Sequence, residues 1–311
     1  MKFLDIKTDY AFKKVFGSED SKERLISFLN AILYSESADF LKIKDLTIVD
    51  PYNIPMLKGM KDTFVDVKAI LSDNSKVIIE MQVINHDGFE KRVLYNAAKN
   101  YSSQLVTKEQ YSLLNPIIAL SIVDFNMFED SPSVITKFKL LEKKQFIDYS
   151  DDLELVFIEL PKFTKEYHQV ENIRDEWIWF VKNASSVEHT PDGISKTLKS
   201  AFEVANEANL QPEELELQYK KQEFILVQKS SITKATREGN EKGHQEGLKE
   251  GIKEGLKEGI KEGIKEGIKE GIEKGKIEIA RNLLDVLDNE TISLKTGLSI
   301  DEVEAIRNAS K

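Results

Sequence analysis

The feature that most constrains the fold is a glycine that returns at every fourth position from Gly239 to Gly275, within the repeat Gly-(Ile/Leu)-Lys-Glu. In an α-helix a four-residue step turns about 400°, so each row of equivalent side chains drifts about 40° per repeat. No row can lie against one flat partner, so the repeat cannot form one face of a globular core. Each glycine also costs about 1 kcal/mol relative to alanine. We expect a long helix that acts as a spacer or self-association element and is populated mainly when another copy is present.

The remainder of the chain changes character along its length. Alternating apolar segments precede about residue 165, and charged helical patterns dominate afterwards. Near the end, Gly297 is placed to terminate one helix, and Ser299 with Glu302 fits a capping box for the next. We predict four parts: an α/β core at 1–165, a helical region at 166–236 that packs on or extends the core, the repeat at 237–276, and a small helical pair at 277–311.

The order of elements in the core predicts an α/β fold with a mixed sheet. Apolar residues recur at helical spacing in 8–34, with a break at Gly17, and again in 89–106. Extended patterns cover 44–50, 63–73 and 75–83, and near-continuous apolar runs at 116–125 and 153–160 are typical of strands buried on both faces. Such a sheet would be flanked by helices and followed here by an α-helical C-terminal extension.

The most informative unit is a predicted hairpin, FVDVKAILSDNSKVIIEMQV, at 64–83. Asp73-Asn74 marks a turn between two alternating runs, and a three-residue loop at 72–74 would place Asp66 directly opposite Glu80. One face is apolar and must be core; it holds Val65, Val67, Ala69, Leu71, Val77, Ile79, Met81 and Val83. The other face holds Asp66, Lys68, Glu80 and Gln82.

Two opposed carboxylates on neighbouring strands predict a bound cation. Their Cβ atoms would lie about 4.5–5.5 Å apart, so the charges repel unless a cation or a proton lies between them. Oxygen ligands of this kind suit Mg²⁺ or Mn²⁺ rather than zinc. A divalent ion held by Asp66 and Glu80 would bind a phosphodiester and generate hydroxide from a water ligand. The alternative is a solvated hairpin face that carries ordinary polar residues.

The arrangement of Asp66, thirteen intervening residues and Glu80-Met81-Gln82 resembles the PD-(D/E)XK nuclease superfamily. More closely, the chain is similar to the Rpn family of recombination-promoting nucleases, which are often labelled transposases. The similarity covers roughly residues 1–165 and is carried by TDYAFKKVFG (8–17), FVDVKA (64–69), IEMQ (79–82), FEKRVLYNAAKNYSSQL (89–105), YSLLNPIIALSIVDF (111–125) and FIELPKF (157–163). It implies a restriction-endonuclease-like mixed sheet and a nuclease activity.

The resemblance implies roles for the residues of the hairpin. Asp66 and Glu80 correspond to the metal-binding acids, and the backbone carbonyl of Met81 would be a further ligand. Gln82 stands where the superfamily motif has lysine, so the charge that assists attack on the phosphate is missing there. We hypothesise that Lys68 supplies it, with a salt bridge to either acid as the alternative.

Residues outside the hairpin are candidates for the same site. An acid from the first helix often joins it in this superfamily, so Asp9 is a candidate metal ligand, although the helix dipole equally explains an acid in a first turn. Lys13 and Lys14 are candidate phosphate contacts. Arg92, Tyr95 and Lys99 recur along one side of a helix, opposite Leu94, Ala97 and Tyr101, and suit a phosphate backbone. For each of these sets the alternative is an ordinary solvated helix face.

Composition limits the partners of the chain. The net charge is −10, yet in residues 1–110 the 14 Lys and 2 Arg balance 10 Asp and 6 Glu, so a local basic patch for DNA remains compatible with it. There is no cysteine, which excludes disulfides and thiolate metal sites. The start of the sequence lacks an apolar signal segment, and no run approaches the ~18 apolar residues of a membrane span. We expect a soluble, cytoplasmic protein with no membrane partner.

Together these patterns and the resemblance predict a Mg²⁺- or Mn²⁺-dependent DNA endonuclease. The resemblance alone implies a link to recombination, mobile elements or defence. We expect a homo-oligomer, such as a dimer, formed through the C-terminal helical region. One alternative is a catalytically degenerate nuclease fold that acts as a DNA-binding or oligomeric scaffold, for which Gln82 is the best support. Another is a pure interaction protein, which the acidic second half of the chain favours.

Overall fold

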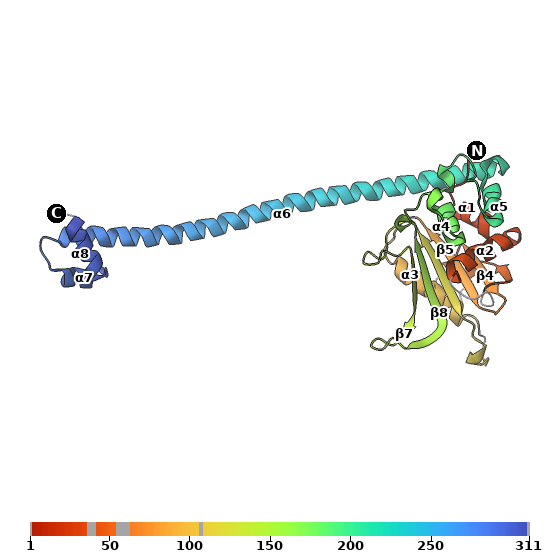
Figure 1. Ribbon diagram of the computed structural model, residues 1–311, viewed down its shortest axis with the longest axis horizontal. Coiled ribbons are helices and arrows are strands. Elements are labelled where there is room, and N and C mark those ends of the chain that lie inside the picture. Colours follow the sequence, from red (N-terminus) through yellow and green to blue (C-terminus); the bar gives the residue numbers. More distant parts are fainter. Residues whose placement is uncertain (1, 36–41, 54–62, 106–107, 310–311) are drawn as a thin grey trace. The chain divides into compact units, whose positions relative to one another are not determined.

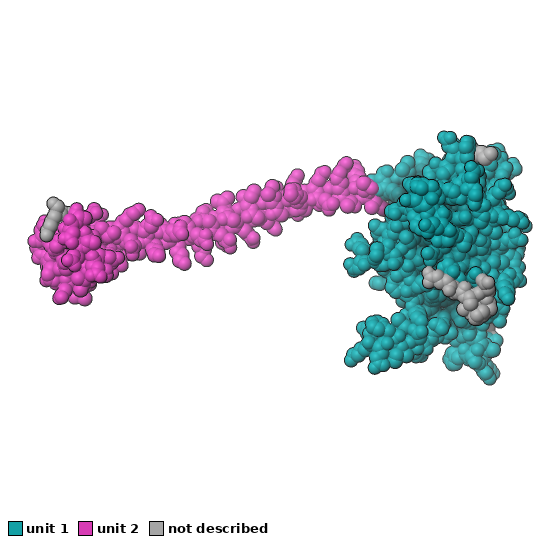
Figure 2. All heavy atoms as spheres, in the orientation of Figure 1, with its two compact units in different colours: residues 1–231 teal, residues 232–311 magenta. Residues whose placement is uncertain are grey.

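A computed structural model describes residues 2–35, 42–53, 63–105 and 108–309 of the chain. The structure separates into two compact units, residues 1–231 and residues 232–311, coloured separately in Figure 2. Helix α6, Pro212–Leu283, begins in the first unit and ends in the second. The finer division into four parts stays a prediction.

A six-stranded mixed sheet lies at the centre of the first unit (Figure 1). Its strands follow the order β1 (Leu46–Val49), β4 (Val67–Leu71), β5 (Lys76–Gln82), β6 (Ile117–Val123), β8 (Asp148–Glu159) and β7 (Ile135–Leu141). The β5–β6 and β6–β8 pairs are parallel and the others are antiparallel. Strands β2 (Tyr52–Asn53) and β3 (Thr63–Phe64) form a separate antiparallel pair. The predicted α/β class with a mixed sheet and an α-helical extension is confirmed.

Four helices cover one face of this sheet: α1 (Asp9–Phe16), α2 (Lys22–Leu33), α4 (Ile173–Asn183) and α5 (Lys196–Ala205). Helix α1 begins where the sequence predicts, because the Thr8 side chain accepts a hydrogen bond from the Ala11 N–H. The indole of Trp177 is fully buried in the core and packs 5.5 Å from the ring of Phe16 and 5.9 Å from that of Phe28. The predicted apolar face of the hairpin, from Val67 to Met81, joins this core.

Helix α3 (Phe89–Ser102) covers the opposite face. Its buried stripe is Phe89, Val93 and Ala97, which pack against Ile78 of β5 and against β6. Two sequence expectations are wrong here. Leu94 is 49% exposed, since the buried stripe follows the i, i+4, i+8 row through Phe89. Val65 belongs to this second core and not to the face of Val67, because it precedes the start of regular pairing in β4.

The edge strand β7 is absent from the sequence-based prediction. Its residues Ile135–Leu141 carry two lysines, and both Phe138 (40%) and Leu140 (47%) are exposed. A strand with one partner and a lysine-rich sequence shows little of the alternation that marks a half-buried strand. Short 3₁₀ helices lie at Glu19–Ser21, Tyr111–Leu113, Leu160–Lys162, Tyr167–Gln169, Ala184–Ser186 and Glu207–Asn209.

In the second unit the repeat is helical, as the sequence predicts, and forms most of the α6 residues found there. Its seven Ile and Leu side chains, from Leu248 to Ile272, are each 56–59% exposed. Helices α7 (Asn289–Thr296) and α8 (Ile300–Ala309) pack on the end of α6 through Ala280, Ile292 and Val303. Over the described ranges, none of the helices is both long enough and apolar enough to cross a bilayer.

The predicted end of α7 and the predicted start of α8 are confirmed. Gly297 ends α7 with φ +72°, in the left-handed region that favours glycine. The Ser299 N–H donates to the Glu302 carboxylate at 2.7 Å, and the Glu302 N–H donates to the Ser299 hydroxyl at 3.3 Å. This reciprocal capping box starts α8.

Candidate active site

The candidate site lies where β4 begins and β5 ends. The pairing of Val67 with Ile79 and of Lys68 with Ile78 confirms the register predicted from the three-residue loop. The predicted direct opposition of Asp66 and Glu80 is wrong, because the Asp66 N–H donates at 2.9 Å to the carbonyl of Ile79, which is already the partner of Val67. The register shifts by one residue there, and both acids still lie at the same end of the hairpin. Their side chains are only 12% and 16% exposed, which does not fit a solvated hairpin face.

A backbone amide and a lysine hold Asp66. Its Oδ2 accepts a 2.8 Å hydrogen bond from the Met81 N–H, and its Oδ1 lies 3.2 Å from the Lys13 Nζ. Burial raises the pKa of Asp66; the Met81 N–H and Lys13 oppose this rise, and the Asp9 carboxylate adds to it. Because burial outweighs these partners, an additional cation would stabilise the ionised form.

An arginine from α3 holds Glu80. The Arg92 Nη2 donates to the Glu80 Oε1 at 2.6 Å, which joins the helix to β5. Burial raises the pKa of Glu80, Arg92 opposes the rise, and the Asp66 carboxylate reinforces it. The Asp66 carboxylate therefore lies near enough to disfavour the ionisation of Glu80, which agrees with the repulsion expected between two acids at one end of the hairpin.

The same arginine also contacts Gln82. Its Nη2 donates to the Gln82 Oε1 at 2.7 Å, and the Gln82 Nε2 donates to the Ile84 carbonyl at 2.7 Å. The amide of Gln82 is therefore fixed at both ends. The Arg92 guanidinium brings a positive charge to the position where the superfamily motif has its lysine. The predicted role of Arg92 as a phosphate contact does not include these bonds to Glu80 and Gln82.

The donor atoms of this site fit a hard divalent cation. The N–H and carbonyl of a strand residue point to the same side, so the Met81 carbonyl faces the side on which Asp66 binds the Met81 N–H. Among the described residues, no group of three or more His, Cys, Asp or Glu side chains is placed to hold a metal ion. Two half-buried carboxylates, a backbone carbonyl and water would therefore make up the ligands, a set that suits Mg²⁺ or Mn²⁺.

Asp9 and Lys13 border the site from α1. Lys13 forms the ion pair with Asp66 and is 45% exposed. Asp9 raises the pKa of Asp66 and is thus near it, but its Oδ2 also lies 3.2 Å from the Nζ of Lys221 on α6. Asp9 therefore lies near Asp66, while a metal-binding role for Asp9 stays a prediction.

Lys14 faces away from the carboxylates. Its Nζ lies 2.7 Å from the Glu214 Oε1 on α6, and the Tyr10 hydroxyl donates to the same oxygen at 2.6 Å. The hydrogen bonds from Lys14 and then Tyr10 lower the pKa of Glu214 to about 2. Lys14 therefore connects α1 to α6, and its predicted contact with phosphate would compete with this pair.

Lys68 lies two residues after Asp66 and is paired with Ile78. Burial lowers the pKa of Lys68; the charge of Lys76 lowers it further, and Asp50 opposes the change. Arg92, by contrast, contacts Glu80 directly.

The predicted basic face of α3 is only partly present. Arg92 and Tyr95 both line a hollow at the start of the helix, and the Tyr95 side chain is 37% exposed. Lys99 is only 3% exposed, so it does not share this surface with them. Lys99 is buried together with its neighbours Asn96 and Asn100, so the buried side of the helix is broader there than the apolar row alone.

Sequence analysis missed Asp124, which directly follows β6. Its N–H donates to the Gln82 carbonyl at 2.9 Å, and its Oδ2 lies 2.7 Å from the Nζ of Lys229 and 3.6 Å from that of Lys7. A polar residue after a fully buried run, at the carboxyl end of a strand parallel to β5, is the signal that could have found it. These ion pairs connect α6 to the edge of the sheet beside Gln82.

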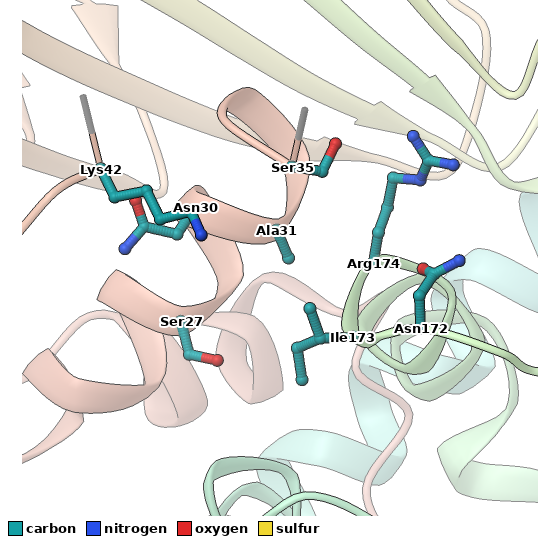
Figure 3. A pocket seen from close by; sticks show the side chains of 8 residues that line it. All are labelled: Ser27, Asn30, Ala31, Ser35, Lys42, Asn172, Ile173 and Arg174. Carbon is teal, nitrogen blue, oxygen red and sulfur yellow. The ribbon is translucent and has the colours of Figure 1, made fainter. Parts of the chain in front are cut away.

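A separate hollow of about 390 Å³ lies between α2 and the start of α4 (Figure 3). Polar side chains such as Asn30, Lys42 and Arg174 line it, and none of its described lining residues is an acid. Among these residues it has no counterpart of the two acids at the end of the hairpin.

Comparison with family models matches residues 6–235 to the PD-(D/E)XK nuclease family transposases. Neither a curated protein nor a solved structure matches the chain at a significant level. The matched range covers more than half of the sequence and includes the sheet, both candidate acids, and the start of α6. The chain therefore belongs to the PD-(D/E)XK nuclease family transposases.

Proposed function

We propose that this protein is a DNA endonuclease that hydrolyses phosphodiester bonds with the help of Mg²⁺ or Mn²⁺. The observation that carries the proposal is the presence of two half-buried carboxylates, Asp66 and Glu80, at one end of the β4–β5 hairpin. Their raised pKa values mark a site at which ionised acids gain from an added cation. Membership of a nuclease family supports the same chemistry.

The residues have distinct parts in this proposal. When bound, the divalent ion would polarise the phosphate and activate a water ligand. Asp66, Glu80 and the Met81 carbonyl hold the ion, and the Met81 N–H orients Asp66 by binding its Oδ2. Arg92 supplies the positive charge that Gln82 cannot, because its guanidinium already lies between Glu80 and Gln82.

Lys13 and Arg92 neutralise the two acids in the structure, at 3.2 Å and 2.6 Å respectively. Both are more than one-third exposed and have long side chains, so each can turn from its carboxylate towards a phosphate oxygen. We infer that these two cations neutralise the site when it is empty and bind the DNA backbone when it is loaded.

A cleavage assay with supercoiled plasmid tests the proposal. The wild-type chain is expected to nick the plasmid with Mg²⁺ or Mn²⁺ and not with EDTA. Glu80→Gln is expected to abolish nicking, while Glu90→Gln, an exposed position on α3, should retain it. Nicking that persists in EDTA, or in Glu80→Gln at the wild-type rate, would refute the metal-site assignment.

A catalytically degenerate DNA-binding scaffold is the second candidate. It is favoured by Gln82 in place of the motif lysine and by the direct bond that holds Glu80 to Arg92. Absence of nicking with every metal, together with retained DNA binding, would favour this function. We propose a role in recombination, mobile-element or defence biology, and a cytoplasmic location, from membership of the family alone.

We also propose that the C-terminal unit associates with a second copy. The Ile/Leu row and the glycine row of the repeat are adjacent, about 100° apart around the helix. Each row follows the i±4 direction, and a ridge of this kind packs into a facing groove with the two axes crossing at about −50°. The Ile/Leu side chains, which are 56–59% exposed, form the ridge. The glycines, which have no side chain, leave the groove. Sedimentation equilibrium of the full chain tests this; a monomer at all concentrations would refute it.

A further inference from the structure

A hollow of about 720 Å³ lies beside the carboxylate pair, at the start of α3. Its volume is within the range of small-molecule pockets, about 300–1,000 Å³. Arg92 lines the hollow while binding Glu80, so one wall of the hollow and the candidate active site share a side chain. A group that enters the hollow would therefore lie next to the position proposed for the phosphate.

Two aromatic rings in this hollow are accessible. Phe64 is 65% exposed, and its ring stacks on that of Tyr52, with centroids 4.7 Å apart and 27° between the planes. Tyr95, across from β3 on α3, is 37% exposed. An exposed phenylalanine already stacked on a second ring provides a flat apolar surface on which a nucleobase can continue the stack.

Three residues of the wall carry polar atoms that the protein leaves unpaired. In the described part of the chain, the Thr63 Oγ1, the Arg92 Nε and the Asn96 Oδ1 are buried and have no hydrogen-bond partner. Thr63 is 7% and Asn96 3% exposed, so water does not compensate them. The three unpaired groups are a hydroxyl, an N–H donor and an amide oxygen, a mixed set like the edge of a nucleobase. A ligand in the hollow that drew these side chains towards it would supply the partners that the protein does not.

The charges around the hollow favour the backbone of a nucleic acid. Lys91 and Arg92 contribute two cations to the lining, and Asp87 contributes one acid. A nucleotide placed with its base on Phe64 could direct its phosphate towards these cations. The lining thus combines the two components of single-strand recognition, an aromatic platform and basic side chains that follow the backbone.

We propose that this hollow binds an unpaired nucleotide of the DNA substrate, in a single strand or a base turned out of a duplex, and thereby sets the substrate class of the neighbouring site. The inference rests on the proposed nuclease function. In a regular duplex both faces of each base are covered by neighbours and the pairing edge is occupied, so neither Phe64 nor the unpaired polar atoms could contact it. An unpaired base offers both its face and its edge.

Binding of oligonucleotides in EDTA tests this without cleavage. The full-length wild-type chain is titrated into single-stranded and duplex DNA of the same sequence, each carrying 2-aminopurine, at about 0.1 M salt. We expect tighter binding of the single strand, with quenched 2-aminopurine fluorescence as the base stacks. Phe64→Ala should weaken single-strand binding by about tenfold and abolish the quenching, and Phe64→Tyr should retain both.

Tyr111→Ala is the matched control, because Tyr111 is 85% exposed and lies outside the hollow. Equal affinity for single strand and duplex, or unchanged quenching in Phe64→Ala, would overturn the proposal. Metal-dependent cleavage of duplex plasmid in that case would leave the nuclease function standing. Binding of neither DNA in EDTA would also overturn the proposal, whereas only the absence of metal-dependent plasmid cleavage would overturn the nuclease function.

Discussion

Arg92 on α3 donates one hydrogen bond of 2.6 Å to Glu80 and another of 2.7 Å, from the same nitrogen, to Gln82 on β5. The Arg92 guanidinium also lies over the ring of Phe89, with its central carbon 5.2 Å from the ring centroid. A single arginine thus neutralises a candidate metal-binding acid, fixes the residue that replaces the motif lysine, and lines the neighbouring hollow.

Loss of this arginine should destabilise the fold in the absence of metal. Arg92→Ala leaves Glu80 buried with its closest cation removed, and we expect the free energy of unfolding to fall by about 1–3 kcal/mol. Urea unfolding followed by circular dichroism measures this. Mg²⁺ should recover more stability in Arg92→Ala than in wild type, because the ion replaces the missing charge. Lys91→Ala, an exposed neighbour, should change the unfolding free energy by less than about 0.5 kcal/mol.

The pH dependence of the free energy of unfolding should report the cost of burying the ionised Asp66 carboxylate. Burial raises the pKa of Asp66 in the folded state above its unfolded value, so its favourable contribution is present below the unfolded pKa and is lost as pH rises through the folded pKa. Without metal, Asp66→Asn should therefore melt above wild type at pH 7, and the difference should vanish below about pH 4.

At pH 7, Mg²⁺ should reverse the order of the melting temperatures of wild type and Asp66→Asn. Mg²⁺ binding to the folded state raises the melting temperature of wild type, whereas Asp66→Asn lacks one ligand and should respond weakly. Scanning calorimetry with and without Mg²⁺ measures both effects. An Asp66→Asn protein that melts below wild type at pH 7 without metal would mean that the Met81 and Lys13 contacts outweigh burial.

The two candidate cations can be separated by their effects on cleavage. Arg92→Ala should lower the single-turnover rate at saturating Mg²⁺ by about 10²–10³-fold, the usual effect of removing one electrostatic partner of the transition state. Lys68→Ala should have a smaller effect, since Arg92 already contacts Glu80 directly at 2.6 Å. The hypothesis drawn from the sequence, in which Lys68 supplies the missing charge, predicts the reverse order of the two rates.

Alanine substitutions in the repeat should separate helix stability from association. A Cβ at Gly255, Gly259 or Gly263 meets nothing within 4 Å, so each change to alanine should favour the helix by about 1 kcal/mol. If the glycine row receives the Ile/Leu row of a second copy, the triple variant should gain helicity and yet associate more weakly. Gly239→Ala is the control, because Asn240 follows it in place of Ile or Leu. Stronger association of the triple variant would exclude the glycine groove.

Local patterns were sufficient to predict the hairpin and the termini of several helices. The alternation in 64–83 and the Asp73-Asn74 turn fix the register, because a shift by one residue would expose Val77 and Ile79. The positions of Asp66 and Glu80 at one end of the hairpin follow directly. Likewise, Thr8 and Ser299 cap their helices by bonding to residues three positions ahead. Contacts between residues so close in the sequence can be expected from the sequence itself.

Contacts between distant elements could not be predicted in this way. The partnership of Arg92 with Glu80 depends on how α3 rotates over the sheet, and the sequence placed the buried stripe around Leu94 rather than Phe89. The same rotation buries Lys99. The ion pairs of Lys221 with Asp9 and Lys229 with Asp124 span more than 100 residues, and nothing local in the start of α6 indicates them.

The most direct test of the account compares two identical substitutions at opposite ends of one hairpin. Asp66→Asn removes a proposed metal ligand, while Asp73→Asn alters the turn, where its side-chain oxygen accepts a hydrogen bond from the Ser75 N–H. The measurement is the rate at which each variant relaxes supercoiled plasmid with saturating Mg²⁺. We predict that Asp73→Asn cuts at close to the wild-type rate and that Asp66→Asn is slower by at least about 10²-fold. Cleavage by Asp66→Asn at the wild-type rate would contradict the account.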